Sequence, residues 1–112
     1  MPILLTTPFD PGELDTGTYP RAKIIRLEID PEYNWIKMIV QFGDQDGNDW
    51  NPGVAGHMEV LVQDTVDPPC TDYTDLVSTH TSNNGELTYV AVKRGCYEWL
   101  IANESRLAGT IE

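Results

Sequence analysis

Two β-strands joined by a turn are predicted from residues 22–43, which read AKIIRLEIDPEYNWIKMIVQFG. In the first half, Ile25, Leu27 and Ile29 alternate with charged residues, and a period of two is typical of a strand with one buried face. An Asp-Pro-Glu turn follows, after which apolar residues again occupy every second position. This segment therefore predicts an antiparallel hairpin.

Alternation also occurs at residues 57–63, which predict a third strand. The apolar run at 3–7 has the composition of a strand, but the prolines around it indicate an edge strand or an extended N-terminal arm over residues 1–20. Such an arm could pair with the chain's own sheet or with a neighbouring subunit. If it serves assembly, deletion of residues 1–8 is expected to abolish assembly and to leave the fold intact.

The period changes to that of a helix in residues 86–103, which read ELTYVAVKRGCYEWLIAN. Apolar residues such as Tyr89, Val92 and Cys96 recur three or four positions apart and form one helical stripe. Gly95 costs about 1 kcal/mol relative to Ala inside a helix, which indicates a close approach to the sheet.

The predicted fold class is α+β, in a single domain over residues 1–112. We expect a small antiparallel sheet of three to four strands that is packed by a C-terminal helix and a short helix. The predicted strands are at about 22–30, 34–43 and 57–63, with 3–7 as the fourth, and the predicted helices are at about 71–79 and 86–103.

Acidic residues dominate the charge of the chain, since 18 Asp and Glu oppose 7 Lys and Arg and give a formal net charge of −11. A surface of this sign repels phosphate backbones and anionic lipids, so neither nucleic acid nor a membrane is a predicted partner. The N-terminus lacks the basic start of a signal peptide, and no apolar run approaches the roughly 20 residues of a membrane span. Folding in a cytoplasm is therefore expected.

No catalytic residue and no cofactor are predicted, because His57 and His80 stand apart from any motif for catalysis or metal binding. The acidic loop offers Asp44, Asp46 and Asp49 as candidate calcium ligands, although Asp-Gly is also ordinary turn chemistry. The chain is thus not expected to be an enzyme.

The two cysteines lie outside any CxxC spacing. Cys96 falls on the helical stripe and is expected to be buried as a small apolar residue. Cys70 follows two prolines in a connection, and a Cys70–Cys96 disulfide stays an open alternative.

Apolar residues outside the predicted core are the candidates for partner contacts. Some lie on the outer faces of predicted strands and the others in the arm. These residues are Trp35, Ile39 and Leu61 on the strands, and Ile3, Leu4 and Leu5 in the arm.

Several segments resemble the small virion structural proteins of tailed bacteriophages in their layout. They are MPILLTTP at 1–8, AKIIRLEID and WIKM in the hairpin, KRGCYEWLI at 93–101 and AGTIE at 108–112. The resemblance implies a non-enzymatic subunit of a head, neck or tail, assembled in the host cytoplasm into the virion. It also implies that the partners are other virion proteins or copies of the chain itself, as in a homo-oligomer.

Two other functions stay open from the residues alone. The net charge is consistent with an acidic inhibitor that mimics nucleic acid and blocks a host DNA-binding protein. The acidic loop is consistent with a calcium-binding module.

Overall fold

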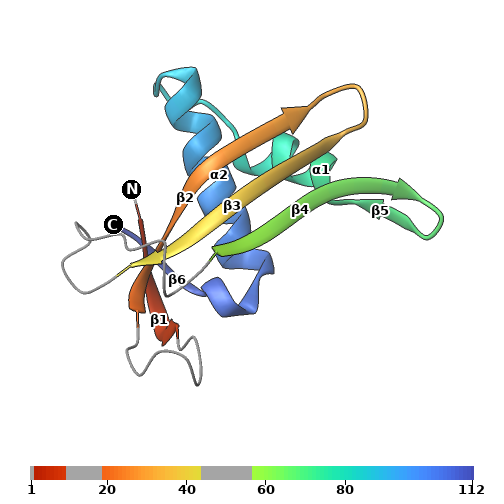
Figure 1. The fold of residues 1–112 in the computed structure, drawn as a ribbon. Coiled ribbons are helices and arrows are strands. Elements are labelled where there is room, and N and C mark those ends of the chain that lie inside the picture. The colour runs from red at the N-terminus through yellow and green to blue at the C-terminus, as the bar shows by residue number, and fades with distance from the viewer. Residues whose placement is uncertain (1, 10–18, 44–56) are drawn as a thin grey trace.

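A curled six-stranded antiparallel sheet forms a half-barrel, with its strands in the order β5-β4-β3-β2-β1-β6 (Figure 1). The structure is a computed structural model, and it describes residues 2–9, 19–43 and 57–112. The strands are β1 Ile3–Phe9, β2 Tyr19–Asp30, β3 Trp35–Gly43, β4 His57–Val66, β5 Pro69–Thr71 and β6 Gly109–Ile111. The helical elements are α1 Asp72–Asp75, a π-helical turn Leu76–His80, α2 Thr88–Asn103 and a 3₁₀ turn Ser105–Leu107.

The predicted fold class is wrong, because the sheet is not a small one of three to four strands. Two strands that the sequence did not reveal, β5 and β6, extend it at both ends. Each of them has only three residues, which is too short for an alternation of apolar and polar positions to be visible.

Strand β1 belongs to the chain's own sheet, where it lies between β2 and β6. Ile3 is opposite Ala22 on one side and Ile111 on the other, and Leu5 is opposite Gly109. Of the predicted arm, residues 10–18 lie outside the described residues. The position of β1 argues against the expectation that the fold survives without residues 1–8, since their removal would delete most of an interior strand.

Strand β2 contains a bulge that its alternating sequence does not predict. Ile24 is opposite Val40 and Arg26 is opposite Ile39, so Ile25 has no partner of its own in β3. The extra residue interrupts the period of two. The predicted shared face of Ile25, Leu27 and Ile29 is therefore wrong at Ile25.

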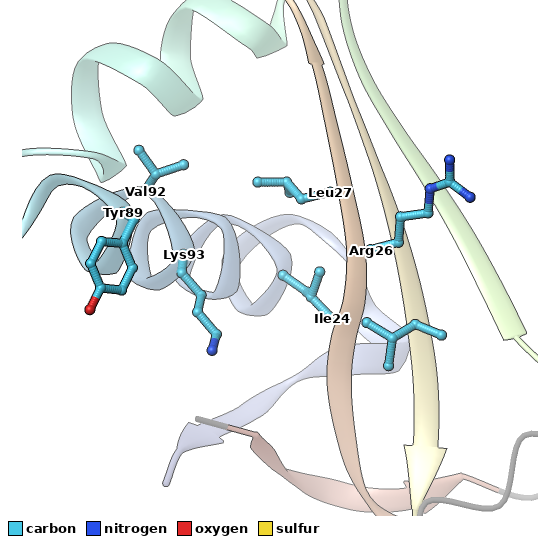
Figure 2. A pocket seen from close by; sticks show the side chains of 7 residues that line it. Ile24, Arg26, Leu27, Tyr89, Val92 and Lys93 are labelled. Carbon is cyan, nitrogen blue, oxygen red and sulfur yellow. The ribbon is translucent and has the colours of Figure 1, made fainter.

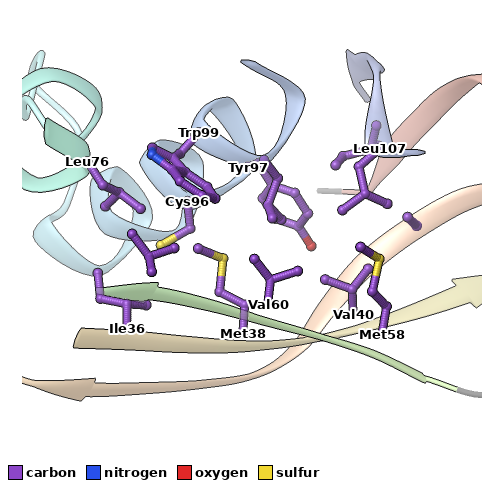
Figure 3. Packing of buried hydrophobic residues seen from close by; sticks show 14 of the residues in the cluster. Ile36, Met38, Val40, Met58, Val60, Leu76, Cys96, Tyr97, Trp99 and Leu107 are labelled. Atoms are coloured by element: carbon purple, nitrogen blue, oxygen red, sulfur yellow. The ribbon is translucent and has the colours of Figure 1, made fainter. Parts of the chain in front are cut away.

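The core lies between the inner face of the sheet and α2 (Figure 3). The strands contribute mainly alternate residues, and α2 contributes a band of side chains wider than one stripe. The buried apolar residues are Ile3, Leu5, Ala22, Ile36, Met38, Val40, Phe42, Met58, Val60, Val62, Leu76, Ala91, Cys96, Tyr97, Trp99, Leu100 and Leu107. Phe9 stacks on Phe42 with 3.7 Å between the ring centroids and extends the core toward the end of β1.

Helix α2 is covered from two sides, because the π-helical turn packs on it as well as the sheet. Arg94 links α2 to the π-helical turn by a 3.5 Å hydrogen bond to the carbonyl oxygen of His80. It donates hydrogen bonds to Glu86 and Glu98 at 2.7 Å each, and another of 2.7 Å to the carbonyl oxygen of Ser82. Gly95 approaches the backbone of His80 in the π-helical turn rather than the sheet, which corrects the sequence-based expectation.

One end of α2 is less buried than its stripe predicts. Tyr89 is 71% exposed. The curled sheet leaves the first turn of α2 beside β2 (Figure 2), and a groove lies between them.

Candidate functional site

The structure divides the predicted contact residues into two groups. Ile3 and Leu5 are buried in the core and are not accessible to a partner in the folded chain, whereas Leu4 is exposed.

The predicted calcium ligands Asp44, Asp46 and Asp49 lie outside the described residues. Trp35, Ile39 and Leu61 lie together on the outer face of the sheet, as the register of β3 and β4 shows.

These three residues form what we call the outer patch: Trp35, Ile39 and Leu61. In the register of β3 and β4, Trp35 is opposite Gln63 and Lys37 is opposite Leu61. The same four side chains surround a shallow hollow of about 220 Å³. Leu61 is 53% exposed, so the patch presents apolar surface at the middle of the sheet.

The charges around the outer patch are mixed rather than uniformly acidic. Four of the seven basic residues of the chain lie in β2 and β3, namely Arg21, Lys23, Arg26 and Lys37. The Nζ atom of Lys37 in β3 lies 3.5 Å from Oε1 of Glu59 in β4. Within β2, a guanidinium nitrogen of Arg26 lies 2.8 Å from Oε1 of Glu28. Mimicry of nucleic acid needs a regular array of negative charge, and this face of the sheet does not provide one.

A groove runs between β2 and the first turns of α2 (Figure 2). We call it the β2 groove, and its volume is about 420 Å³. Its lining is apolar apart from two basic side chains and the hydroxyl of one tyrosine. The lining residues are Ile24, Ile25, Arg26, Leu27, Tyr89, Val92 and Lys93.

The β2 groove borders an open edge of the sheet. Within the described residues, β1 is opposite β2 only at Tyr19, Arg21 and Ala22. The hydroxyl oxygen of Tyr97 then accepts a 2.8 Å hydrogen bond from the amide of Ile24. Beyond this point, β2 continues to Asp30 with β3 as its strand partner.

Sequence reasoning missed the β2 groove, because the strand pairing that exposes it is a long-range property. The sequence contains one sign of this surface: from Ile25 to Ile29, apolar residues alternate with charged residues. Ile25 and Ile29 are 43% and 47% exposed. These two residues can be recognised as part of a surface only once it is known that the pairing of β2 with β1 stops at Ala22.

Neither a metal site nor a membrane helix is found in the described part of the chain. Among residues 2–9, 19–43 and 57–112, no three side chains of His, Cys, Asp or Glu are grouped so that they could hold a metal ion. No helix in these ranges has the length and apolar composition needed to span a bilayer.

Both cysteines are free thiols, and their environments differ. Burial raises the pKa of the Cys96 thiol to about 11. A hydrogen bond with Asp72 raises the pKa of the Cys70 thiol, which is only half-buried. Burial also raises the pKa of the Tyr97 hydroxyl.

A thiol reagent is expected to distinguish the two cysteines at pH 8. With a pKa of about 11, Cys96 is a thiolate in about one molecule in a thousand, and it is also buried. Ellman's reagent should therefore modify Cys70 in the native protein and Cys96 only after denaturation, as peptide mapping would show. Rapid modification of Cys96 in the folded Cys70→Ser variant would contradict the buried placement of this thiol.

The raised pKa of Cys96 also predicts how stability depends on pH. An unperturbed thiol ionises near pH 9, whereas the folded thiol stays protonated up to about pH 11. The unfolded state therefore loses its proton first, and the contribution of this thiol to stability, complete below pH 9, is lost as the pH rises through 11.

No protein-family model, no curated protein and no solved structure matches this chain.

Proposed function

We propose that this chain is a non-enzymatic interaction protein that joins a larger assembly through the outer patch. The observation that carries the proposal is the apolar surface of Leu61 and Trp35 around a hollow at the middle of the sheet. Contiguous apolar surface of this kind is typical of protein–protein contact sites.

The surroundings of the outer patch also favour a protein partner. Lys37, beside Leu61, is paired with Glu59, so the patch has a charged border of both signs. An apolar centre with a polar rim is the usual anatomy of an interface. The hollow has a volume of about 220 Å³, below the roughly 300–1,000 Å³ of typical small-molecule sites.

The resemblance to small virion proteins of tailed bacteriophages supports a virion as the assembly. In this proposal the partner is a larger virion protein of the head, neck or tail. Repetition of the subunit around a particle multiplies weak contacts, so one modest patch per copy is sufficient for stable incorporation.

Incorporation into particles tests this proposal. The chain is produced together with the other virion proteins of its source, and particles are purified on a density gradient. Quantitative mass spectrometry then compares the wild type with the Leu61→Asp variant. A charge at the centre of an interface removes a contact of about 2 kcal/mol, so we expect at least a tenfold loss of the variant from particles.

The matched control is Val66→Asp, which adds the same charge at a residue that is 92% exposed and outside the outer patch. This variant should enter particles like the wild type. A wild-type chain that is absent from particles refutes the virion as the setting. Equal incorporation of both variants refutes the role of the outer patch.

A further inference from the structure

The open edge of β2 is a place where another strand can add to the sheet. Residues 25–30 have β3 on one side, and within the described residues no strand lies on the other side. Successive backbone groups of a strand point alternately to its two sides, so this edge presents amide and carbonyl groups to a further strand. The β2 groove lies along the same edge (Figure 2).

The two halves of this edge have complementary chemistry. The half at residues 24–27 lines the β2 groove, where Lys93 of α2 provides a positive charge, whereas the side chain of Arg26 points away from α2 (Figure 2). The half at residues 27–30 reads Leu-Glu-Ile-Asp and alternates apolar with acidic side chains. An extended apolar and acidic segment complements an apolar groove that has a positive charge at Lys93.

We propose that the β2 groove binds the β2 edge of a second copy of this chain, so that two sheets join around a two-fold axis at Leu27. In this antiparallel register, Leu27 lies opposite Leu27 of the second copy, and Arg26 lies opposite Glu28. Residues 28–30 of each copy then lie along the groove of the other. The contact is isologous, because each copy offers both the groove and the segment that fills it.

The register is selected by charge. Arg26 and Glu28 lie on one face of β2, where they form a 2.8 Å ion pair within one copy. Pairing centred on Arg26 would oppose two arginines, and pairing centred on Glu28 would oppose two glutamates. Like charges directly opposite each other destabilise a strand pair, whereas opposite charges stabilise it. Of these three registers, only the one centred on Leu27 makes every cross-strand charge contact attractive.

The apolar residues of the edge gain partners in the same register. Ile25 of one copy reaches the position opposite Ile29 of the other, and these two residues are among the exposed large apolar side chains of the chain. The bulge at Ile25 ends the regular part of β2, so the pairing is short and the dimer is a moderate one. The net charge of −11 opposes association over longer distances, and salt near 0.15 M screens that repulsion to about 8 Å.

Charge reversal at Arg26 and Glu28 tests the proposal. Sedimentation equilibrium at 0.15 M salt measures the dimer Kd of the wild type, Arg26→Glu, Glu28→Arg and the double variant. Each single variant opposes like charges twice in the dimer, so we expect at least a tenfold rise in Kd. The double variant restores both attractive pairs, and its Kd should return to within about threefold of the wild type.

A mixture of the two single variants is the sharpest arm of this experiment. One copy with two acids and one copy with two bases attract at both contacts, so an equimolar mixture should form heterodimers that neither variant forms alone. The control Arg106→Glu changes the net charge by the same amount as Arg26→Glu, at an exposed residue far from β2 along the chain. Its Kd should stay near that of the wild type.

A wild-type chain that is monomeric at every concentration overturns the proposal, and so does a dimer whose Kd is the same in all four proteins. Circular dichroism of each variant separates loss of pairing from loss of fold. The inference rests on the proposed function only in that the chain works by assembling, and it concerns a different surface. If Leu61→Asp enters particles normally while the dimer Kd depends on the charges at Arg26 and Glu28, only the role of the outer patch is refuted. If Leu61→Asp is lost from particles while the dimer Kd does not depend on these charges, only the role of the β2 edge is refuted.

Discussion

Deletion of residues 1–8 is expected to leave the protein without a cooperative unfolding transition. The deletion removes nearly all of β1, which pairs with β2 on one side and with β6 on the other. It exposes the edge of β2 around Ala22 and leaves β6 without its neighbour. It also removes the buried side chains of Ile3 and Leu5. Each such loss costs about 2–5 kcal/mol, and a domain of this size has only about 5–15 kcal/mol in total.

Two point variants test the contribution of β1 to stability with smaller changes. Ile3→Ala removes a fully buried side chain, and we expect the free energy of unfolding to fall by about 2–5 kcal/mol. Leu4→Ala is the matched control, because Leu4 points away from the core and is exposed, and its cost should stay below about 1 kcal/mol. Urea denaturation followed by tryptophan fluorescence measures both. Equal stability of the two variants, or a truncated chain that unfolds cooperatively, would show that β1 is dispensable.

The sequence predicts most of strand β3 well because its burial alternates from Trp35 to Val40. Ile36, Met38, Val40 and Phe42 are all buried, and Trp35 begins the opposite set. From Trp35 to Ile39 this strand has regularly paired neighbours on both sides, so a local pattern reports the tertiary environment faithfully.

Prediction fails where the environment changes along an element. In β2 the bulge adds a residue at Ile25, and nothing in a run of two isoleucines indicates which of them is extra. In α2 the exposed Tyr89 and the buried Ala91 and Gly95 depend on the sheet and on the π-helical turn together. A single-stripe interpretation assumes one covering surface, and α2 has two.

The outer patch could be predicted from the sequence, whereas the β2 groove could not. Trp35 and Leu61 could be identified because an apolar residue at an outward position contradicts the alternation of its own strand. The β2 groove could not be identified from the sequence, because it exists only where β2 no longer pairs with β1 and α2 passes beside the edge of β2. The charges of Arg26 and Glu28 therefore become informative only after the edge is known.

Replacement of Gly95 by Ala is expected to destabilise the protein by about 1–3 kcal/mol, against the trend for helices. In an unconstrained helix this change stabilises by about 1 kcal/mol. At Gly95, however, a Cβ atom would overlap the carbonyl group of His80 and the side-chain methyl of Thr81. Most of these atoms are backbone, so the π-helical turn must move away from α2. That movement disturbs the hydrogen bonds from Arg94 to His80 and Ser82.

The matched control is Ala102→Gly in the same helix, at an exposed residue near its C-terminal end. At this position glycine should lower the free energy of unfolding by about 0.5–1 kcal/mol, because it increases the backbone entropy of the unfolded chain. The two substitutions exchange the same pair of residues in opposite directions, so helix propensity alone predicts effects of opposite sign. Thermal and urea denaturation should instead show that both variants are less stable than the wild type. A Gly95→Ala protein with raised stability would mean that the π-helical turn does not lie against α2, since only that contact makes glycine necessary there.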